Sequence, residues 1–154
     1  MGNYKRFMDD IGEEIGYGIK KGDNHITPMS KAVVVLRKIN NELKIVTSYP
    51  IDFDVSKAKD MDDQYEEFSC LLLYFLHDSY ENPEISKIQT IQRYVLEEDS
   101  HNIKKALEEG AVVLKLEPFP HEWIINTMNR EGDSGWVHEI IEILEQEAKK
   151  AGKI

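Results

Sequence analysis

Four side chains in the first fifty residues are of the types that metal-free RNA cleavage uses. A histidine can exchange a proton with the 2′-hydroxyl, while arginine, threonine and tyrosine donors can hold the phosphate as charge develops in the transition state. The candidates, at or near the ends of two strand-like segments, are His25, Arg37, Thr47 and Tyr49. Strands commonly contain Thr and Tyr, and Arg37 beside Lys38 is equally typical of solvated charge at a hairpin end. Both interpretations stay open.

Motifs of other enzyme classes are absent. The sequence has no Walker A motif, no GxGxxG and no nucleophile elbow, and its five histidines show no metal-ligand spacing. The neighbours His77 and Asp78 could act as an acid and base, but adjacent helical residues point about 100° apart. The single cysteine, Cys70, excludes an internal disulfide and a cysteine-based zinc site. We therefore expect no metal and no cofactor.

Negative charge is concentrated in the second part of the chain. Residues 1–60 carry 10 Lys and Arg against 9 Asp and Glu, whereas residues 61–154 carry 9 against 20, a net charge of −11. Such a surface repels nucleic acid and attracts basic proteins through a field that salt weakens. A solvated acidic surface that only maintains solubility is the alternative. The acids expected to contact a basic partner are Asp78, Glu81, Glu97, Glu98 and Asp99.

The first part of the chain predicts a helix and then an antiparallel β-hairpin. The β-branched run 32–36 and the segment 43–49 flank Asn40 and Asn41, and Asn tolerates the positive φ of a tight hairpin turn. Residues 52–62, rich in Asp, are expected to be a charged linker or crossover. The apolar residues whose four-residue spacing predicts the preceding helix are Phe7, Ile11, Ile15 and Ile19.

The second part predicts mainly helices. The apolar face of residues 65–76 indicates a helix that is buried on most sides. Its longest apolar run, 70–76, is far shorter than the roughly 20 residues of a membrane span, and the N-terminus lacks a signal-peptide layout. We therefore expect a cytoplasmic protein without membrane contact. The residues Asn82-Pro83-Glu84 predict the start of the next helix, which would end near Glu98.

The remaining helix boundaries follow from capping residues. Ser100 can cap a helix over 101–109 with Gly110 as its left-handed stop, and residues 111–116 fit a strand or a helix equally well. Residues after Pro120 predict a short helix, and Asp133 with Ser134 predicts the cap of a last one.

The hairpin resembles a known group of toxins. The run 32–38 and the ending Thr47-Ser48-Tyr49-Pro50 are similar to the closing hairpin of small ribonuclease toxins of the barnase, EndoU, colicin and RelE type. Many of these are the C-terminal tips of contact-dependent growth inhibition effectors, whose chains finish on Thr-(Ala/Ser)-Tyr-Pro. The resemblance covers about 30 residues and implies RNA cleavage by His25, Arg37, Thr47 and Tyr49.

Residues 61–154 resemble a different component of the same systems. The stretch 68–78, the acidic helix through 94–98 and Gly132-Asp133-Ser134-Gly135-Trp136 are similar to small helical immunity proteins of contact-dependent growth inhibition. These proteins have a Tyr-Phe-x-x-Asp element, here ending at Asp78, and a late helix headed by Trp. The resemblance implies a non-enzymatic protein that blocks the basic, phosphate-binding cleft of a nuclease toxin with acidic side chains.

The sequence thus predicts an α+β chain with three parts: a helix and hairpin over 1–51, a linker over 52–62 and an acidic helical domain over 63–154. Its leading predicted function is toxin neutralisation by protein contact, without direct binding to nucleic acid. One alternative is a ribonuclease-like toxin remnant. Another is an acidic nucleic-acid mimic that inhibits a DNA-binding protein.

Overall fold

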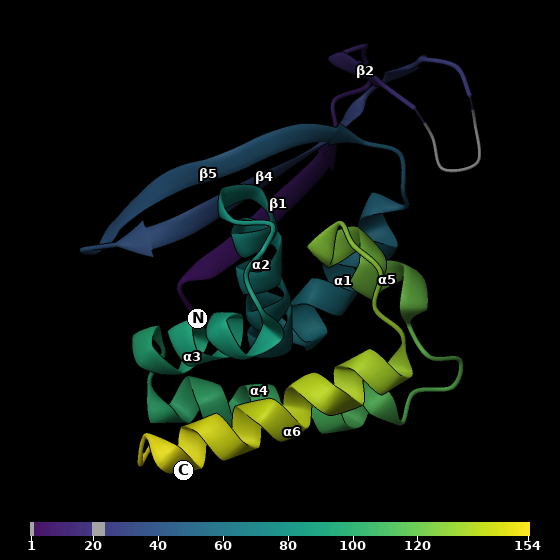
Figure 1. Ribbon diagram of the computed structural model, residues 1–154. Helices are drawn as coiled ribbons and strands as arrows, with labels where there is room; N and C mark the ends of the chain where they lie inside the picture. Colours follow the sequence, from purple (N-terminus) through teal and green to yellow (C-terminus); the bar gives the residue numbers. More distant parts are fainter. Residues whose placement is uncertain (1, 20–23) are drawn as a thin grey trace.

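The computed structural model describes residues 2–19 and 24–154 and has an α+β fold (Figure 1). Three strands form an antiparallel sheet in the order β1-β4-β5, and β2 pairs with β3 in a separate two-stranded sheet. The predicted α+β class is confirmed. Within the described residues the elements are β1 (Tyr4–Asp10), β2 (Gly16–Gly18), β3 (Thr27–Met29), β4 (Lys31–Ile39), β5 (Glu42–Ile51), α1 (Val55–Gln64), α2 (Glu66–Glu81), α3 (Lys87–Glu97), α4 (Ser100–Leu114), α5 (His121–Met128) and α6 (Ser134–Lys150).

The predicted hairpin is confirmed as β4 and β5. Asn40 and Asn41 form its turn, and both have positive φ angles, 51° and 64°. These angles match the right-handed twist of the two strands, which is why Asn is suited to both positions. The register shifts by one residue opposite Val35 and Leu36, so β5 contains a bulge.

The predicted N-terminal helix is wrong, because residues 4–10 form strand β1 and residues 16–18 form β2. Gly12 has a φ of 79°, and its backbone N–H donates to Asp10 Oδ1 at 3.0 Å, which makes a turn between the strands. The apolar stripe does not face a core. Its members are largely exposed: Phe7 51%, Ile11 51%, Ile15 42% and Ile19 62%.

Helix α1 occupies most of the segment that the sequence predicts to be a linker or crossover. The Asp54 side chain caps its first turn by accepting the backbone N–H of Lys57 at 3.1 Å. The helix buries Ala58 and places Asp62 against Arg6 of β1. The helical pattern is weak in sequence because most of its charged residues face solvent and only one small apolar residue is buried.

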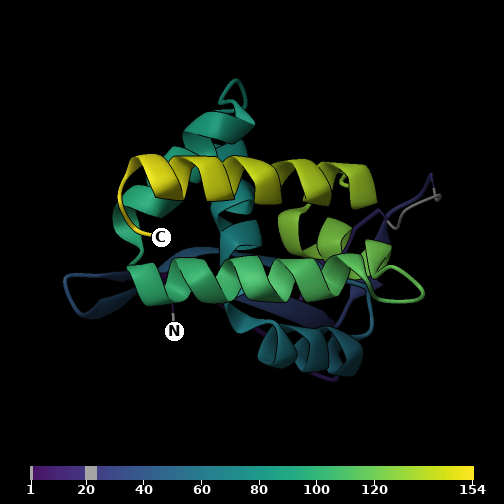
Figure 2. The ribbon, with the colours of Figure 1, turned by 90° about the horizontal axis from the view of Figure 1, so that it is seen from below.

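One hydrophobic core joins the sheet to the helices, which lie on one face of the three-stranded sheet (Figure 1). Met8, Val33 and Val35 point from the inner face of the sheet into this core. Helix α2 is buried along most of its length, as its apolar pattern predicts. Figure 2, which views the molecule from below, shows α4 and α6 running side by side in front of α2 and the sheet. The core therefore contains residues of both 1–51 and 63–154.

Two predicted helix starts are shifted. Helix α3 is capped by Ser86 through a capping box with Gln89, so Asn82 and Pro83 lie in the preceding loop. Helix α4 is capped by Asp99, whose side chain accepts the backbone N–H of Asn102 at 2.8 Å, and Ser100 is its first residue. Adjacent Asp and Ser side chains can both accept a hydrogen bond from the first turn of a helix. The sequence alone therefore does not show which of the two is the cap.

Gly110 is not a helix stop, because α4 continues through it to Leu114. A Cβ atom at this position would lie 2.8 Å from Ile141 Cδ1 and 3.2 Å from Phe68 Cδ2. The glycine permits close packing of α4 against α6 and α2. The last two predicted helices are confirmed as α5 and α6, and Asp133 caps α6.

Candidate functional site

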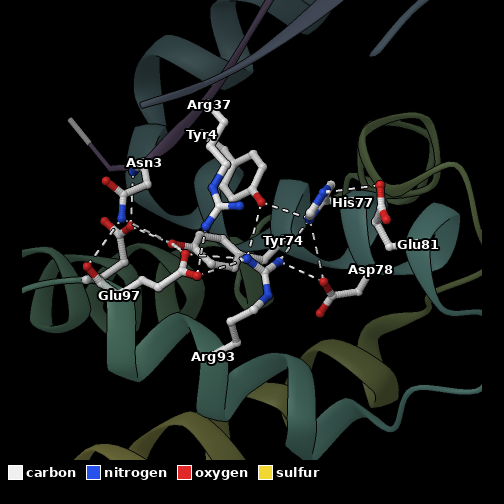
Figure 3. Close-up of polar contacts among 10 residues, drawn as sticks. Asn3, Tyr4, Arg37, Tyr74, His77, Asp78, Glu81, Arg93 and Glu97 are labelled. Carbon is white, nitrogen blue, oxygen red and sulfur yellow. Dashed lines mark hydrogen bonds and ion pairs between the residues drawn. The ribbon is translucent and has the colours of Figure 1, made fainter. Parts of the chain in front are cut away.

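Most of the acids predicted to contact a partner lie in a polar cluster between the sheet and helices α2 and α3 (Figure 3). Tyr4 comes from β1 and Arg37 from β4, and the helices contribute the rest. We refer to the following residues as the buried polar cluster: Tyr4, Arg37, Tyr74, His77, Asp78, Arg93, Glu97 and Glu98.

Arg93 is at the centre of this cluster. Its Nη2 donates to Asp78 Oδ1 at 2.7 Å, and its Nη1 donates to the Tyr4 hydroxyl at 3.2 Å. The guanidinium also stacks over the ring of Tyr74, 4.5 Å from the centroid. The Tyr4 hydroxyl makes a further hydrogen bond of 2.9 Å with Nδ1 of His77. Asp78 thus neutralises the charge of Arg93, and side chains of α2 and β1 hold its guanidinium in place.

Glu97 and Glu98 also have partners inside the protein. Arg37 Nη2 donates to Glu97 Oε1 at 2.9 Å, which ties the hairpin to α3. Glu98 is only 2% exposed, and its Oε2 accepts the Tyr74 hydroxyl at 2.7 Å and the backbone N–H of Asn3 at 3.0 Å. A buried carboxylate requires such donors, because desolvation of an unpaired charge is costly.

The protonation equilibria reflect this pairing. Burial acts to raise the pKa of Asp78, but hydrogen bonds from His77, Thr90 and Arg93 outweigh it and lower that pKa. Desolvation acts to lower the pKa of Arg93, and the contacts with Tyr4 and Asp78 raise it instead. Burial raises the pKa of the Tyr4 hydroxyl despite the nearby guanidinium groups. The ion pair Asp78–Arg93 is therefore held in its charged form.

The five predicted partner contacts consequently fall into two groups. Asp78, Glu97 and Glu98 belong to the buried polar cluster and serve internal contacts. Glu81 and Asp99 are exposed. Glu81 lies 3.9 Å from His77 Nε2, and Asp99 is the cap of α4. The cluster holds the sheet against α2 and α3, and only its exposed edge remains for a partner.

The four candidates for RNA cleavage lie in different environments. His25 is exposed in the segment before β3, while Arg37 is near the tip of the hairpin and paired with Glu97. Tyr49 packs against the core opposite Val33, and burial raises its pKa to about 12. Val33 is four residues, or about 13 Å, from Arg37 along β4. Thr47, opposite Val35, lies between them.

Among residues 2–19 and 24–154, one group of residues could offer metal ligands, and the sequence does not indicate it. The ligand atoms of Glu67, Cys70 and Glu98 lie within 4.8 Å of one another, and all three residues are buried. Glu98 already accepts the hydrogen bonds from Tyr74 and Asn3, and burial raises the pKa of the Cys70 thiol well above its usual value. The carboxylate of Glu98 thus joins α2 to Asn3, the residue that precedes β1.

The outer face of the three-stranded sheet has no described helix over it and carries several apolar side chains beside the charged Lys5, Asp9 and Lys38. Along this face Phe7 lies opposite Val34, and Leu36 lies opposite Ile45. Phe7 is 51% and Ile45 70% exposed, and all the described helices are on the other side of the sheet (Figure 1). One solvated face of an antiparallel sheet is normally polar, so an apolar stripe here is typical of a contact surface.

A groove leads from this face around the free edge of β1 to helices α1 and α2. Its volume is about 450 Å³. The sheet side includes Phe7, Ala32 and Val34, and the helix side includes Asp63 and Glu66. We refer to this cavity as the edge groove. The sequence does not predict the edge groove, because the apolar residues of the segment that contains β1 have the four-residue spacing of a helix.

No known protein family, curated protein or solved structure matches the chain. Across residues 2–19 and 24–154, the helices are too short or too polar to cross a lipid bilayer.

Proposed function

We propose that this chain is a non-enzymatic inhibitor that binds a basic nuclease toxin in the cytoplasm and neutralises it by protein contact, as an immunity protein does. The observation that carries this proposal is the uncovered apolar stripe on the outer face of the sheet. A contiguous apolar surface costs solubility unless a partner covers it. The chain offers Phe7, Val34, Leu36 and Ile45 there, without a helix over them.

Charge supports the choice of a basic partner. The chain has a formal net charge of −10. Some acids are paired inside the buried polar cluster. Each of these ion pairs contains one negative and one positive charge, so the pairing does not change the net charge of the protein. A field of this sign accelerates association with a basic protein and slows it with nucleic acid.

The placement of the ribonuclease-like residues favours a binding function over an enzymatic one. A metal-free ribonuclease needs an acid, a base and phosphate donors in one geometry. Here Arg37 is committed to Glu97, and Tyr49 is packed on the core. His25 is on the far side of β3 from the hairpin tip.

The test uses purified basic ribonuclease domains, beginning with any encoded beside the gene for this chain. We expect the chain to inhibit tRNA cleavage at an equimolar ratio, with an association rate that falls between about 50 and 150 mM salt because charge steering is screened. Replacement of outer-face residues, Leu36→Lys with Ile45→Lys, should weaken inhibition at least tenfold. The matched control is Leu96→Lys, at an exposed apolar position on α3.

Three results would contradict the proposal. The first is unchanged inhibition in the Leu36→Lys, Ile45→Lys variant, and the second is no inhibition of any basic nuclease domain. The third is tRNA cleavage by the purified chain itself that His25→Ala abolishes. Binding to a DNA-binding protein in place of a nuclease would support the nucleic-acid mimic.

A further inference from the structure

The free edge of β1 has backbone groups available for pairing. Lys38 N donates to Asn3 O, and Ile11 N donates to Ser30 O, at 2.8 Å each. In an antiparallel pair, alternate residues direct both of their backbone groups to the same neighbour. Residues 5, 7 and 9 therefore bond to β4, and Arg6 and Met8 direct their N–H and C=O groups outward. Within the described part of the chain, no hydrogen bond satisfies these four groups.

The opposite edge of the sheet, β5, is less suited to pairing. It contains a bulge opposite Val35 and Leu36, and it contains Pro50, which has no N–H to donate. Bulges and prolines are the usual devices that protect sheet edges from association. Strand β1 has neither: its seven residues pair with β4 in an uninterrupted register. Strand β1 can therefore pair with an added strand, whereas β5 is protected from such pairing.

The edge groove provides room and chemistry beside the outward groups of β1. Asp63 is exposed and Glu66 half-buried on its helix side, and no ion pair neutralises either acid among residues 2–19 and 24–154. Asp62, beside them, is bonded to Arg6 Nε at 2.7 Å and Nη2 at 2.9 Å. The helix wall therefore presents two acids without an ion pair beside the single cation Lys59, and the other side presents the apolar Phe7 and Val34 together with Lys5.

We propose that β1 accepts an extended strand of the basic partner, which adds to the sheet in antiparallel orientation and lies in the edge groove. This inference rests on the proposed function, since it specifies how that partner docks. Alternate side chains of an added strand point to opposite faces. Those on the helix side, whose backbone bonds to Arg6 and Met8, are Lys or Arg facing Asp63 and Glu66. Those on the outer side are apolar and extend the stripe of Phe7 and Val34.

The test uses the full chain and a capped synthetic peptide, acetyl-Lys-Val-Lys-Val-Lys-Val-Lys-amide. Amide hydrogen exchange is followed by NMR at each residue of β1. We expect the peptide to slow exchange at Arg6 and Met8 at least tenfold and to leave Lys5 and Phe7, which already bond to β4, nearly unchanged. A uniform effect along β1, or none, would overturn the proposal.

Two modified peptides test the orientation. In the proposed pairing, the backbone N–H groups of the lysines point to β1 and those of the valines point to solvent. Methylation of the lysine backbone nitrogens should abolish binding, and methylation of the valine nitrogens should leave it within about threefold. Equal binding of both peptides contradicts antiparallel strand addition.

Charge variants test the helix wall. The double variant Asp63→Lys with Glu66→Lys should weaken peptide binding at least tenfold. The control, Glu108→Lys with Glu131→Lys, changes net charge equally at two exposed positions outside the groove. Equal weakening in both would mean that only long-range charge acts. Dimerisation of the chain without peptide, measured by sedimentation and abolished by the peptide, would make a second copy the occupant of β1.

This experiment separates the inference from the proposed function. If the chain inhibits a basic nuclease but that complex does not protect Arg6 and Met8, strand addition fails and the function stands. If the peptide protects these amides and no basic nuclease domain is inhibited, strand addition stands and the proposed function fails.

Discussion

The buried polar cluster and the edge groove both adjoin β1 and use charge in opposite ways. In the cluster, Arg93 and Arg37 neutralise Asp78 and Glu97, and the pairs Arg93–Asp78 and Arg37–Glu97 join different elements of the fold. In the groove, no described residue forms an ion pair with Asp63 or Glu66, although Lys59 lines the same helix side. Acid content alone therefore does not identify a binding surface: what distinguishes the two regions is whether the fold supplies a counter-charge.

The largest expected effect comes from removing the central cation of the cluster. Arg93→Met should lower the free energy of unfolding by about 3 to 5 kcal/mol, because it leaves Asp78 and Glu97 without their shared partner in a buried site. Urea denaturation measures this change. The control is Lys87→Met, in an exposed ion pair with Glu139, which should cost less than about 1 kcal/mol. A similar decrease in the free energy of unfolding in both variants would show that the ion pairs of the cluster stabilise the fold no more than an exposed pair does.

A smaller effect is expected from the hydroxyl that joins β1 to the helices. Tyr4→Phe removes the group that contacts His77 Nδ1 at 2.9 Å and Arg93 at 3.2 Å, and should lower stability by about 1 to 3 kcal/mol. Tyr80→Phe, at a side chain that is 54% exposed, should have almost no effect. Thermal unfolding compares the two. Equal midpoints would show that the Tyr4 hydroxyl is not a structural link.

The acid dependence of stability should also originate in the cluster. The folded-state pKa of Asp78 is lowered, so its contribution is present above the unfolded value near 3.8 and is lost as pH falls toward the folded pKa. Asp78→Asn should therefore reduce stability at neutral pH and flatten the decline below about pH 4. Asp63→Asn in the groove should leave that decline unchanged. Parallel curves for wild type and Asp78→Asn would contradict this assignment.

The smallest effect on stability is expected in the edge groove. Asp63→Asn with Glu66→Gln should change the free energy of unfolding by less than about 0.5 kcal/mol, because neither acid has an ion-pair partner to lose. The same variant should slow association with a basic nuclease domain, whereas Glu97→Gln should mainly reduce stability. Stopped-flow association and urea denaturation give both quantities. A reversed pattern would assign partner contact to the cluster.

Elements with local signals could be predicted from the sequence. The Asn40-Asn41 turn, the apolar helix α2 and the Asp133 cap each depend on a few neighbouring residues. Strand β1 could not be predicted in this way. Its inward positions are Tyr4, Arg6 and Met8, and an arginine faces the core there only because Asp62, 56 residues later, pairs with it.

The candidate site was predictable to a smaller extent. The sequence singles out Glu97 and Glu98 as partner contacts, but the internal role of Glu97 depends on Arg37, which tertiary folding brings from 60 residues away. The four-residue spacing of Arg93 and Glu97 is the one local signal that could have indicated internal pairing. The edge groove has no local signal, since a free backbone edge is a property of the assembled sheet.

The ion pair beneath β1 also has an optical consequence. The indole Nε1 of Trp123 donates to Asp62 Oδ1 at 2.8 Å, and Asp62 in turn holds Arg6 of β1. Trp123 is 6% exposed, and the chain contains one other tryptophan, Trp136. A displacement of Arg6 would change the electric field at the Trp123 indole and shift its fluorescence emission. In a Trp136→Phe background, the protein thus contains its own spectroscopic probe for events at the β1 edge, without an attached dye.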